Sequence, residues 1–152
     1  MVSKTTANCS IVVESDLAAI TGIWRSISRK LQANKFSKEE IFAVHLAFEE
    51  TFVNAVKHGN KGDVSKKVKI DYCVNREKAE ITITDEGSGF NPSAVPDPRC
   101  DENIYKTDGR GLLLIRSYMD AVEYNGRGNV VHLVKYKGKT NTDEREGAKL
   151  KG

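Results

Sequence analysis

A chain of 152 residues is long enough for one domain with a substantial core and too short for two domains of ordinary size. Its 39% hydrophobic and 30% charged residues are typical of a soluble globular protein, and the net charge is only +3. Positive charge on a terminal segment favours solvation over a nucleic-acid surface, and the lysines gather there: Lys135, Lys137, Lys139, Lys149 and Lys151. We therefore expect no direct nucleic-acid partner.

The cysteines and the N-terminus indicate a compartment. Cys9, Cys73 and Cys100 are odd in number and lack metal-type spacing, so no disulfide framework is expected. The first ten residues lack the apolar core of a signal peptide, and no apolar run approaches membrane-spanning length. These features predict a cytoplasmic protein that is not embedded in a membrane.

The first half of the chain predicts one strand and two helices. A strand is expected over 10–14, then a helix over 17–31 with Asp16 as its N-cap, because apolar residues recur there at helical spacing. A second helix is expected to begin at Ser37, which opens a capping box, and to end near Gly59-Asn60.

Alternation of apolar and polar residues then predicts a hairpin of two strands, over 68–74 and 79–84. The segment 88–108 carries all three prolines and little periodicity, which is typical of a functional or mobile loop. A third helix is expected over 112–119.

Two closing strands are expected over 121–124 and 130–136. The segment 138–152 has almost no apolar content, so we expect a disordered tail after a single domain over 1–137. The resulting order β-α-α-β-β-α-β-β groups helices between strands instead of alternating with them. It favours an α+β fold, a two-layer sandwich of a mixed sheet with helices on one face.

The second helix carries a polar stripe. Residues four apart lie on one side of a helix and drift by about 40° per step, so Glu50, Asn54 and His58 line up. The opposite side is expected to be core: Ile41, Val44, Phe48, Phe52 and Ala55. Phe42, Leu46 and Val53 extend the apolar surface so far around that the whole helix should be buried. The small residues Ala43 and Ala47 border the stripe and should leave space above it. A plain hydrated face is the alternative.

The stripe suits phosphate chemistry. Mg²⁺ takes oxygen ligands and usually keeps several waters while binding substrate phosphates, so the amide oxygen of Asn54 is a suitable ligand. Glu50, one turn away, can accept a proton from an attacking water or hydroxyl. His58 can contact phosphate, but at a helix C-terminus the capping of carbonyls is the favoured role.

Two glycine-rich turns add a place for a base and for phosphates. The carboxylate of Asp85 can accept a hydrogen bond from the exocyclic amine of adenine, where guanine presents a carbonyl, and Gly87 and Gly89 would let the backbone approach the base. An ordinary tight turn is the alternative. Gly109-Arg110-Gly111 precedes a predicted helix, whose first amides would form an anion site.

The segment between these turns would be a lid over the nucleotide. Its basic residues are candidates for neutralising phosphate charge: Arg99, Lys106 and Arg110. The alternative for these side chains is that they are merely solvated. For Gly109-Arg110-Gly111 the alternative is a flexible loop that closes onto a helix with Asp108 as its cap. The glycines match neither a Walker A motif nor the dinucleotide-binding fingerprint.

Together these motifs resemble a known family. Glu50-x-x-x-Asn54-Ala55-x-x-His58-Gly59 resembles the N-box of the GHKL ATPase superfamily, which includes gyrase, chaperone, histidine kinase and MutL ATPases. Asp85-x-Gly87-x-Gly89-Phe90 resembles its G1 box, and Gly109-x-Gly111-Leu112 its G2 box. Within the superfamily the chain is most similar, over 10–136, to the bacterial anti-sigma factor serine kinases of partner-switching systems.

This resemblance implies a Bergerat fold and a homodimeric kinase that uses Mg-ATP. Such a kinase phosphorylates a serine on an anti-sigma-factor antagonist and sequesters a sigma factor. By resemblance Glu50 is the catalytic base, Asn54 the Mg²⁺ ligand and Asp85 the adenine-recognising residue. Further residues are expected at the nucleotide: His58, Gly87, Gly89, Phe90, Gly109, Arg110, Gly111 and Leu112.

One motif departs from the family. Gly128-Asn129 stands where the family often has Gly-Thr, although an asparagine can still donate a hydrogen bond. An ATP-binding interaction module without kinase activity is the alternative function. A detached histidine-kinase catalytic domain is disfavoured, because no upstream helical hairpin carries a phosphoacceptor histidine and His45 lies within the predicted ATP-binding helix.

Overall fold

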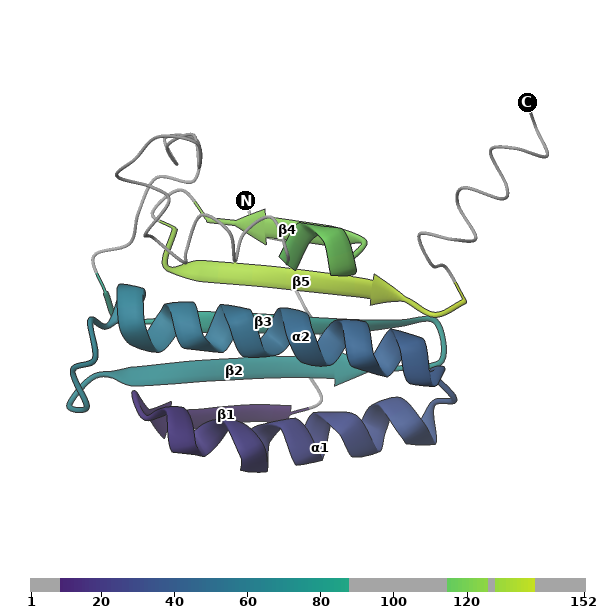
Figure 1. Cartoon of the computed structure of the whole chain (residues 1–152), viewed down its shortest axis with the longest axis horizontal. Coiled ribbons are helices and arrows are strands. Elements are labelled where there is room, and N and C mark those ends of the chain that lie inside the picture. Colours follow the sequence, from purple (N-terminus) through teal and green to yellow (C-terminus); the bar gives the residue numbers. More distant parts are fainter. Residues whose placement is uncertain (1–8, 88–114, 126–127, 139–152) are drawn as a thin grey trace.

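The computed structural model describes residues 9–87, 115–125 and 128–138. It has two layers: a five-stranded sheet in the order β1-β2-β3-β5-β4, with the long helices α1 and α2 across one face (Figure 1). The expected α+β sandwich with helices on one face is confirmed. The sheet differs from the mixed one expected, since each of its four pairings is antiparallel.

Strand β1 (Cys9–Glu14) lies at one edge of the sheet, paired with β2. The carboxylate of Asp16 accepts a hydrogen bond from the amide of Ala18 at 2.9 Å, which confirms the predicted cap. It caps a short 3₁₀ turn, η1 (Leu17–Ala19), and α1 (Ile20–Ala33) follows. The single helix expected here is thus two segments.

Helix α2 (Lys38–Asn54) begins at the predicted capping box. The Ser37 hydroxyl accepts from the Glu40 amide at 3.1 Å, and the Glu40 carboxylate accepts from the Ser37 amide at 2.7 Å. The helical run ends at Gly59, as predicted, but its last turn is not α-helical. The chain widens there into a π turn, η2 (Ala55–Gly59).

Strands β2 (Lys67–Val74) and β3 (Lys78–Asp85) form the predicted hairpin, slightly longer than expected. The carboxamide oxygen of Asn75 accepts from the amides of Glu77 and Lys78, at 2.8 and 2.9 Å, and closes the turn. Because short turns join β2 to β3 and β4 to β5, these pairs must run antiparallel.

Strands β4 (Ala121–Tyr124) and β5 (Val130–Tyr136) have the predicted bounds. Residues 115–118 are helical, within the third helix expected. The loop expected over 88–108 lies outside the described residues, as does the tail beyond Gly138.

The core lies between the sheet and the helices. The predicted core side of α2 is buried except for Ile41, which is partly buried. Alternate residues of β2 and β3 complete it from the sheet: Val68, Ile70, Tyr72, Val74, Ala79, Ile81 and Ile83. The prediction that all of α2 is buried is wrong, because Phe42 is 59% exposed.

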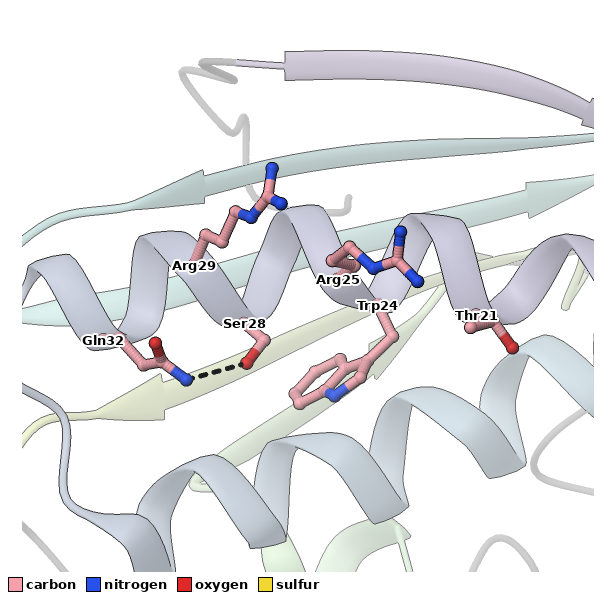
Figure 2. Close-up of a pocket in the computed structure, with 6 residues that line it drawn as sticks. All are labelled: Thr21, Trp24, Arg25, Ser28, Arg29 and Gln32. Atoms are coloured by element: carbon pink, nitrogen blue, oxygen red, sulfur yellow. Dashed lines mark hydrogen bonds between the residues drawn. The ribbon is translucent and has the colours of Figure 1, made fainter.

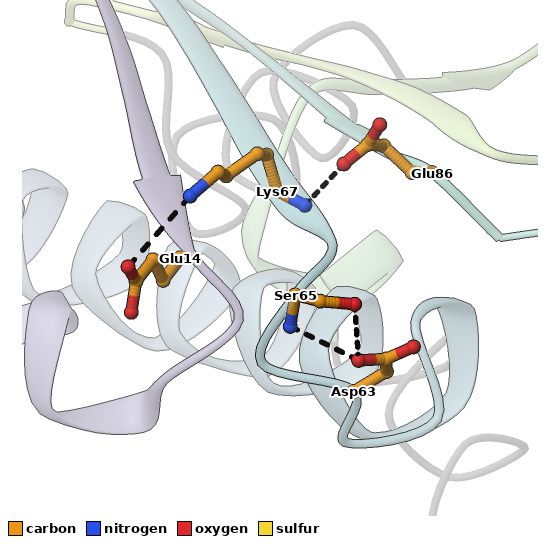
Figure 3. Close-up of polar contacts among 5 residues, drawn as sticks. All are labelled: Glu14, Asp63, Ser65, Lys67 and Glu86. Carbon is orange, nitrogen blue, oxygen red and sulfur yellow. Dashed lines mark hydrogen bonds and ion pairs between the residues drawn. The ribbon is translucent and has the colours of Figure 1, made fainter.

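Lys67, the first residue of β2, contacts the ends of β1 and β3, beside a loop that is closed by Asp63 and Ser65 (Figure 3). The Lys67 ammonium lies 3.7 Å from the Glu14 carboxylate, and the Lys67 amide donates to the carboxylate of Glu86. Ser65 donates to Asp63 through its amide at 3.0 Å and its hydroxyl at 2.6 Å, and these bonds lower the pKa of Asp63. The ends of β1, β2 and β3 therefore meet beside Asp85.

Candidate functional site

The acid and the amide of the predicted stripe lie in the last turns of α2. Glu50 and Asn54 are both half-buried. Within the described ranges neither side chain has a hydrogen-bond or ion-pair partner, so their oxygens are available to a ligand. The small residues Ala43 and Ala47, expected to leave space above the stripe, are themselves buried.

The π turn alters the end of the stripe. The amide of Asn60 donates to the carbonyl of Ala55 at 2.8 Å, five residues back. Such turns are rare and frequent at functional sites. Because a π turn has a wider period than an α-helix, His58 no longer continues the line of Glu50 and Asn54, and it is exposed. A contact between His58 and a nucleotide remains a prediction.

Asp85 ends β3, as predicted, and its side chain is buried against the end of η2. The residue is 9% exposed, and one carboxylate oxygen accepts the Gly87 amide at 2.8 Å. A Cβ atom built on Gly59 would lie 2.3 Å from Asp85 Oδ2, and one on Gly87 would lie 1.8 Å from the Gly59 carbonyl oxygen. Three residues therefore interlock where any side chain at 59 or 87 would collide.

This contact gives Gly87 a second structural reason and shows that Gly59 is also part of the candidate site. Gly87 was expected to let a base approach, whereas the structure shows that the Gly59 backbone also requires it. Gly59 is predicted from the sequence as a helix stop and as the last residue of the N-box. Its part beside Asp85 depends on a contact between residues 26 positions apart, which no local pattern carries.

Asn60 joins the end of η2 to the sheet. Its side chain is fully buried, with the oxygen accepting from the Glu86 amide at 2.8 Å and the nitrogen donating to the Lys67 carbonyl at 2.9 Å. The same nitrogen donates to the Ser15 hydroxyl. Asn60 thus holds the segment that follows Asn54 against the residues that follow Asp85.

The remaining predicted site residues lie outside the described ranges, and the structure leaves them as predictions: Gly89, Phe90, Gly109, Arg110, Gly111, Leu112, and the lid residues Arg99 and Lys106.

The described residues suit a nucleotide with a hard cation. Asp85 is a buried acceptor, flanked by two positions that lack side chains. Glu50 and Asn54 offer a carboxylate and an amide oxygen. Among the described residues no three His, Cys, Asp or Glu side chains gather as metal ligands, so a cation here would depend on phosphates and water. Such coordination is typical of Mg²⁺.

A separate groove of about 400 Å³ runs along α1 (Figure 2) and is lined by Thr21, Trp24, Arg25, Ser28, Arg29 and Gln32. Trp24 reaches from α1 toward α2, where its ring stacks on His45 with centroids 4.4 Å apart and planes 8° apart. His45 lies within α2, where the sequence predicted it, and this stacking gives it a structural role. No residue of the groove belongs to the predicted nucleotide site.

Comparison with known proteins agrees with this geometry. Residues 13–135 match the family described as the histidine kinase-like ATPase domain. The serine-protein kinase RsbW of Listeria monocytogenes is 29% identical over 116 residues, which cover 72% of this chain and 74% of the relative. The anti-sigma F factor of Bacillus thuringiensis is 29% identical over 108 residues, covering 68% of this chain and 74% of that protein.

A solved structure shares the fold. It contains the RsbU and RsbW domains of Rv1364c from Mycobacterium tuberculosis and superposes with a TM-score of 0.58 at 12% identity. The match covers 87% of this chain and 33% of the longer one. In the described part of the chain, no helix has the length and apolar character needed to cross a bilayer. With the motifs, the antiparallel sheet and a match over most of its length in agreement, this chain belongs to the histidine kinase-like ATPase domain family.

Proposed function

We propose that this protein is a Mg-ATP-dependent serine kinase that acts as an anti-sigma factor in the cytoplasm. It phosphorylates an anti-sigma-factor antagonist and sequesters a sigma factor. The half-buried pair of Glu50 and Asn54, in a chain whose relatives are named serine-protein kinase and anti-sigma F factor, carries the proposal.

Glu50, Asn54 and Asp85 have separate roles in the proposed phosphate transfer. The hydroxyl oxygen of the substrate serine attacks the γ-phosphorus of ATP, its proton passes to the Glu50 carboxylate, and the bond to the β–γ bridging oxygen breaks to release ADP. Asn54 would hold a Mg²⁺ ion, which would offset the charge of the phosphates when bound. Asp85 accepts a hydrogen bond from the adenine amine and so orients the nucleotide.

The separation of these roles is testable with a matched pair of glutamates. Glu50→Ala should lose about 100-fold or more of the rate of phosphate transfer, in the range of a general base, while keeping most of the affinity for Mg-ATP. Glu49→Ala is the control, because Glu49 is the exposed neighbour on α2 and, among the described residues, pairs only with His45 at 3.5 Å. Equal losses of ATP affinity and of transfer in Glu50→Ala would remove Glu50 from the role of base.

A nucleotide-gated interaction module is the second candidate, because the half-buried stripe and Asp85 would serve ATP binding without transfer. A pull-down with Mg-ATP, followed by mass spectrometry of the bound proteins and their phosphosites, separates the two. ATP-dependent complexes without a new phosphoserine would favour the module.

The groove on α1 is the surface that we assign to the protein partner. Arg25 and Arg29 are one turn apart and exposed, with no ion pair within the described residues, and α1 holds no acidic residue. Trp24 forms a fixed aromatic wall beside them. This charge suits an acidic segment of the sigma factor.

Reversing these charges tests the assignment. The double variant Arg25→Glu, Arg29→Glu should weaken sigma-factor binding by at least about tenfold, since two charge-assisted contacts are lost. Arg76→Glu, on the exposed turn between β2 and β3, is the control. Equal affinities of the double variant and the control would exclude α1 as the contact.

The proposal includes a homodimer, as the resemblance implies. Light scattering coupled to gel filtration should give twice the mass of the 16.9 kDa chain at micromolar concentration. A mass of one chain over the whole concentration range would remove this part of the proposal.

A further inference from the structure

The main chain of Asp85 is held by Asn129, in the turn between β4 and β5. The Asp85 amide donates to the Asn129 carbonyl at 3.0 Å, and the side-chain nitrogen of Asn129 donates to the Asp85 carbonyl at 3.3 Å. Asn125 supports this contact. Its side-chain nitrogen donates to Asn129 Oδ1 at 2.8 Å, and its oxygen accepts from the Val130 amide at 3.2 Å.

The two ends of this relay determine the direction of each bond. The Val130 amide can only donate and the Asp85 carbonyl can only accept. The carboxamides of Asn125 and Asn129 therefore each have a single orientation in which all of these hydrogen bonds form. Residue 129 must therefore accept from Asn125 and donate to Asp85, and Asn129 does so through Oδ1 and its side-chain nitrogen. Among the side chains of its length, asparagine meets both demands, whereas aspartate lacks the donor and leucine lacks both groups.

The carboxylate of Asp85 is oriented by Gly87 and Gly59. The Gly87 amide binds one of its oxygens at 2.8 Å, and the bare Cα of Gly59 leaves room for the other. Asp85 is thus held at its main chain by Asn129 and at its carboxylate by the glycines. A hydrogen bond to a base needs a donor–acceptor distance of about 2.7–3.2 Å and weakens steeply with misalignment. A small shift of Asp85 would therefore weaken its hydrogen bond to the base.

We infer that Asn129, oriented by Asn125, is a positioning residue that makes Asp85 selective for adenine over guanine. The inference rests on the proposed function, because it takes Asp85 to accept the adenine amine. Asn129 stands where the family often has threonine. A hydroxyl on that shorter side chain cannot offer separate donor and acceptor atoms, so the amide relay is a feature of this chain.

The test compares the affinities for Mg-ATP and Mg-GTP in several variants. Asn129→Ala removes the amide, and Asn129→Leu removes it while keeping its volume. Both should bind Mg-ATP about tenfold more weakly and Mg-GTP almost unchanged, so the ratio of the two affinities falls about tenfold. Asn75→Ala is the control, since Asn75 makes two comparable hydrogen bonds at the far end of β3. It should lower the unfolding temperature and keep the wild-type ratio.

The outcomes separate the inference from the function beneath it. If both Asn129 variants remain folded and keep the wild-type ratio, as Asn75→Ala does, Asn129 is merely structural and the inference fails alone. If the wild-type protein fails to bind Mg-ATP, the proposed function fails and the inference with it. A fall in the ratio confined to the Asn129 variants supports the inference.

Discussion

The carboxylate of Asp85 lies between two glycines, and this contact explains why neither position carries a side chain. The three residues form one unit although Gly59 belongs to a helix end and the other two to the end of a strand. At the scale of single residues, steric exclusion therefore sets where the acceptor points. The substitutions Gly59→Ala and Gly22→Ala distinguish this steric effect from the stabilisation that alanine gives to any helix.

Gly59→Ala should reduce the affinity for Mg-ATP by at least about tenfold, because its methyl group would lie 2.3 Å from Asp85 Oδ2 and displace the carboxylate. Gly22→Ala is the control. It lies in α1 with no heavy atom within 4 Å of the added carbon, so it should stabilise the fold by about 0.5–1 kcal/mol and leave ATP affinity unchanged. Calorimetric titration and thermal unfolding measure both effects. Unaltered ATP affinity in Gly59→Ala would show that Asp85 is not constrained by this contact.

Tyr124 gives the fold a pH dependence on the alkaline side. Burial raises its pKa from 10.0 to about 12, while the nearby charge of Arg116 acts in the opposite direction. The folded state therefore holds the phenolic proton more tightly than the unfolded state. This stabilisation is fully present below pH 10 and is lost as the pH rises from about 10 to about 12.

A shift of this size corresponds to about 2.7 kcal/mol in the free energy of unfolding. Urea unfolding at pH 9 and at pH 11.5 should show a smaller loss of stability in Tyr124→Phe than in the wild type. Parallel losses in the two proteins would mean that Tyr124 titrates as it does in the unfolded chain.

At the scale of elements, hydrophobic periodicity and capping chemistry predicted most of the fold. The strands at 121–124 and 130–136 and the capping box at Ser37 depend on local patterns, and the structure confirms them. The π turn at the end of α2 was missed, because Ala55 and Val56 fit an apolar face at either period. The sequence predicted that Asn129 can donate a hydrogen bond, but it did not identify the partners of Asn129 or of Asn60, for another reason. Their partners lie far away in the sequence and meet them only in the folded sheet.

The start of α2 is joined to the end of β5 through Glu40. One carboxylate oxygen completes the capping box and the other accepts the Gly138 amide, so Glu40→Ala leaves two amides without their partner. It should destabilise the fold by about 2–4 kcal/mol, more than the roughly 1 kcal/mol expected for Ser37→Ala. Glu39→Ala, exposed in the same first turn, is the control. Chemical denaturation that ranks Glu40→Ala with Glu39→Ala would exclude this role.

At the scale of the whole molecule, two working surfaces come from different parts of the fold. The proposed nucleotide residues lie at the end of α2 and at the end of β3, whereas the basic groove lies along α1. Trp24 stacks on His45 at 4.4 Å, so the helix that carries the groove packs directly on the helix that carries Glu50 and Asn54. A conformational change at one surface can thus be transmitted to the other through the packing of α1 on α2. ATP binding and partner binding are expected to influence each other reciprocally.

The most direct test of the account follows labelled phosphate from γ-labelled Mg-ATP to the small antagonist protein that the chain captures. The account predicts a phosphoserine on that partner with the wild-type protein and with Glu49→Ala, and none with Glu50→Ala although it still binds ATP. A wild-type protein that forms the ATP-dependent complex and yet transfers no label would contradict the kinase assignment.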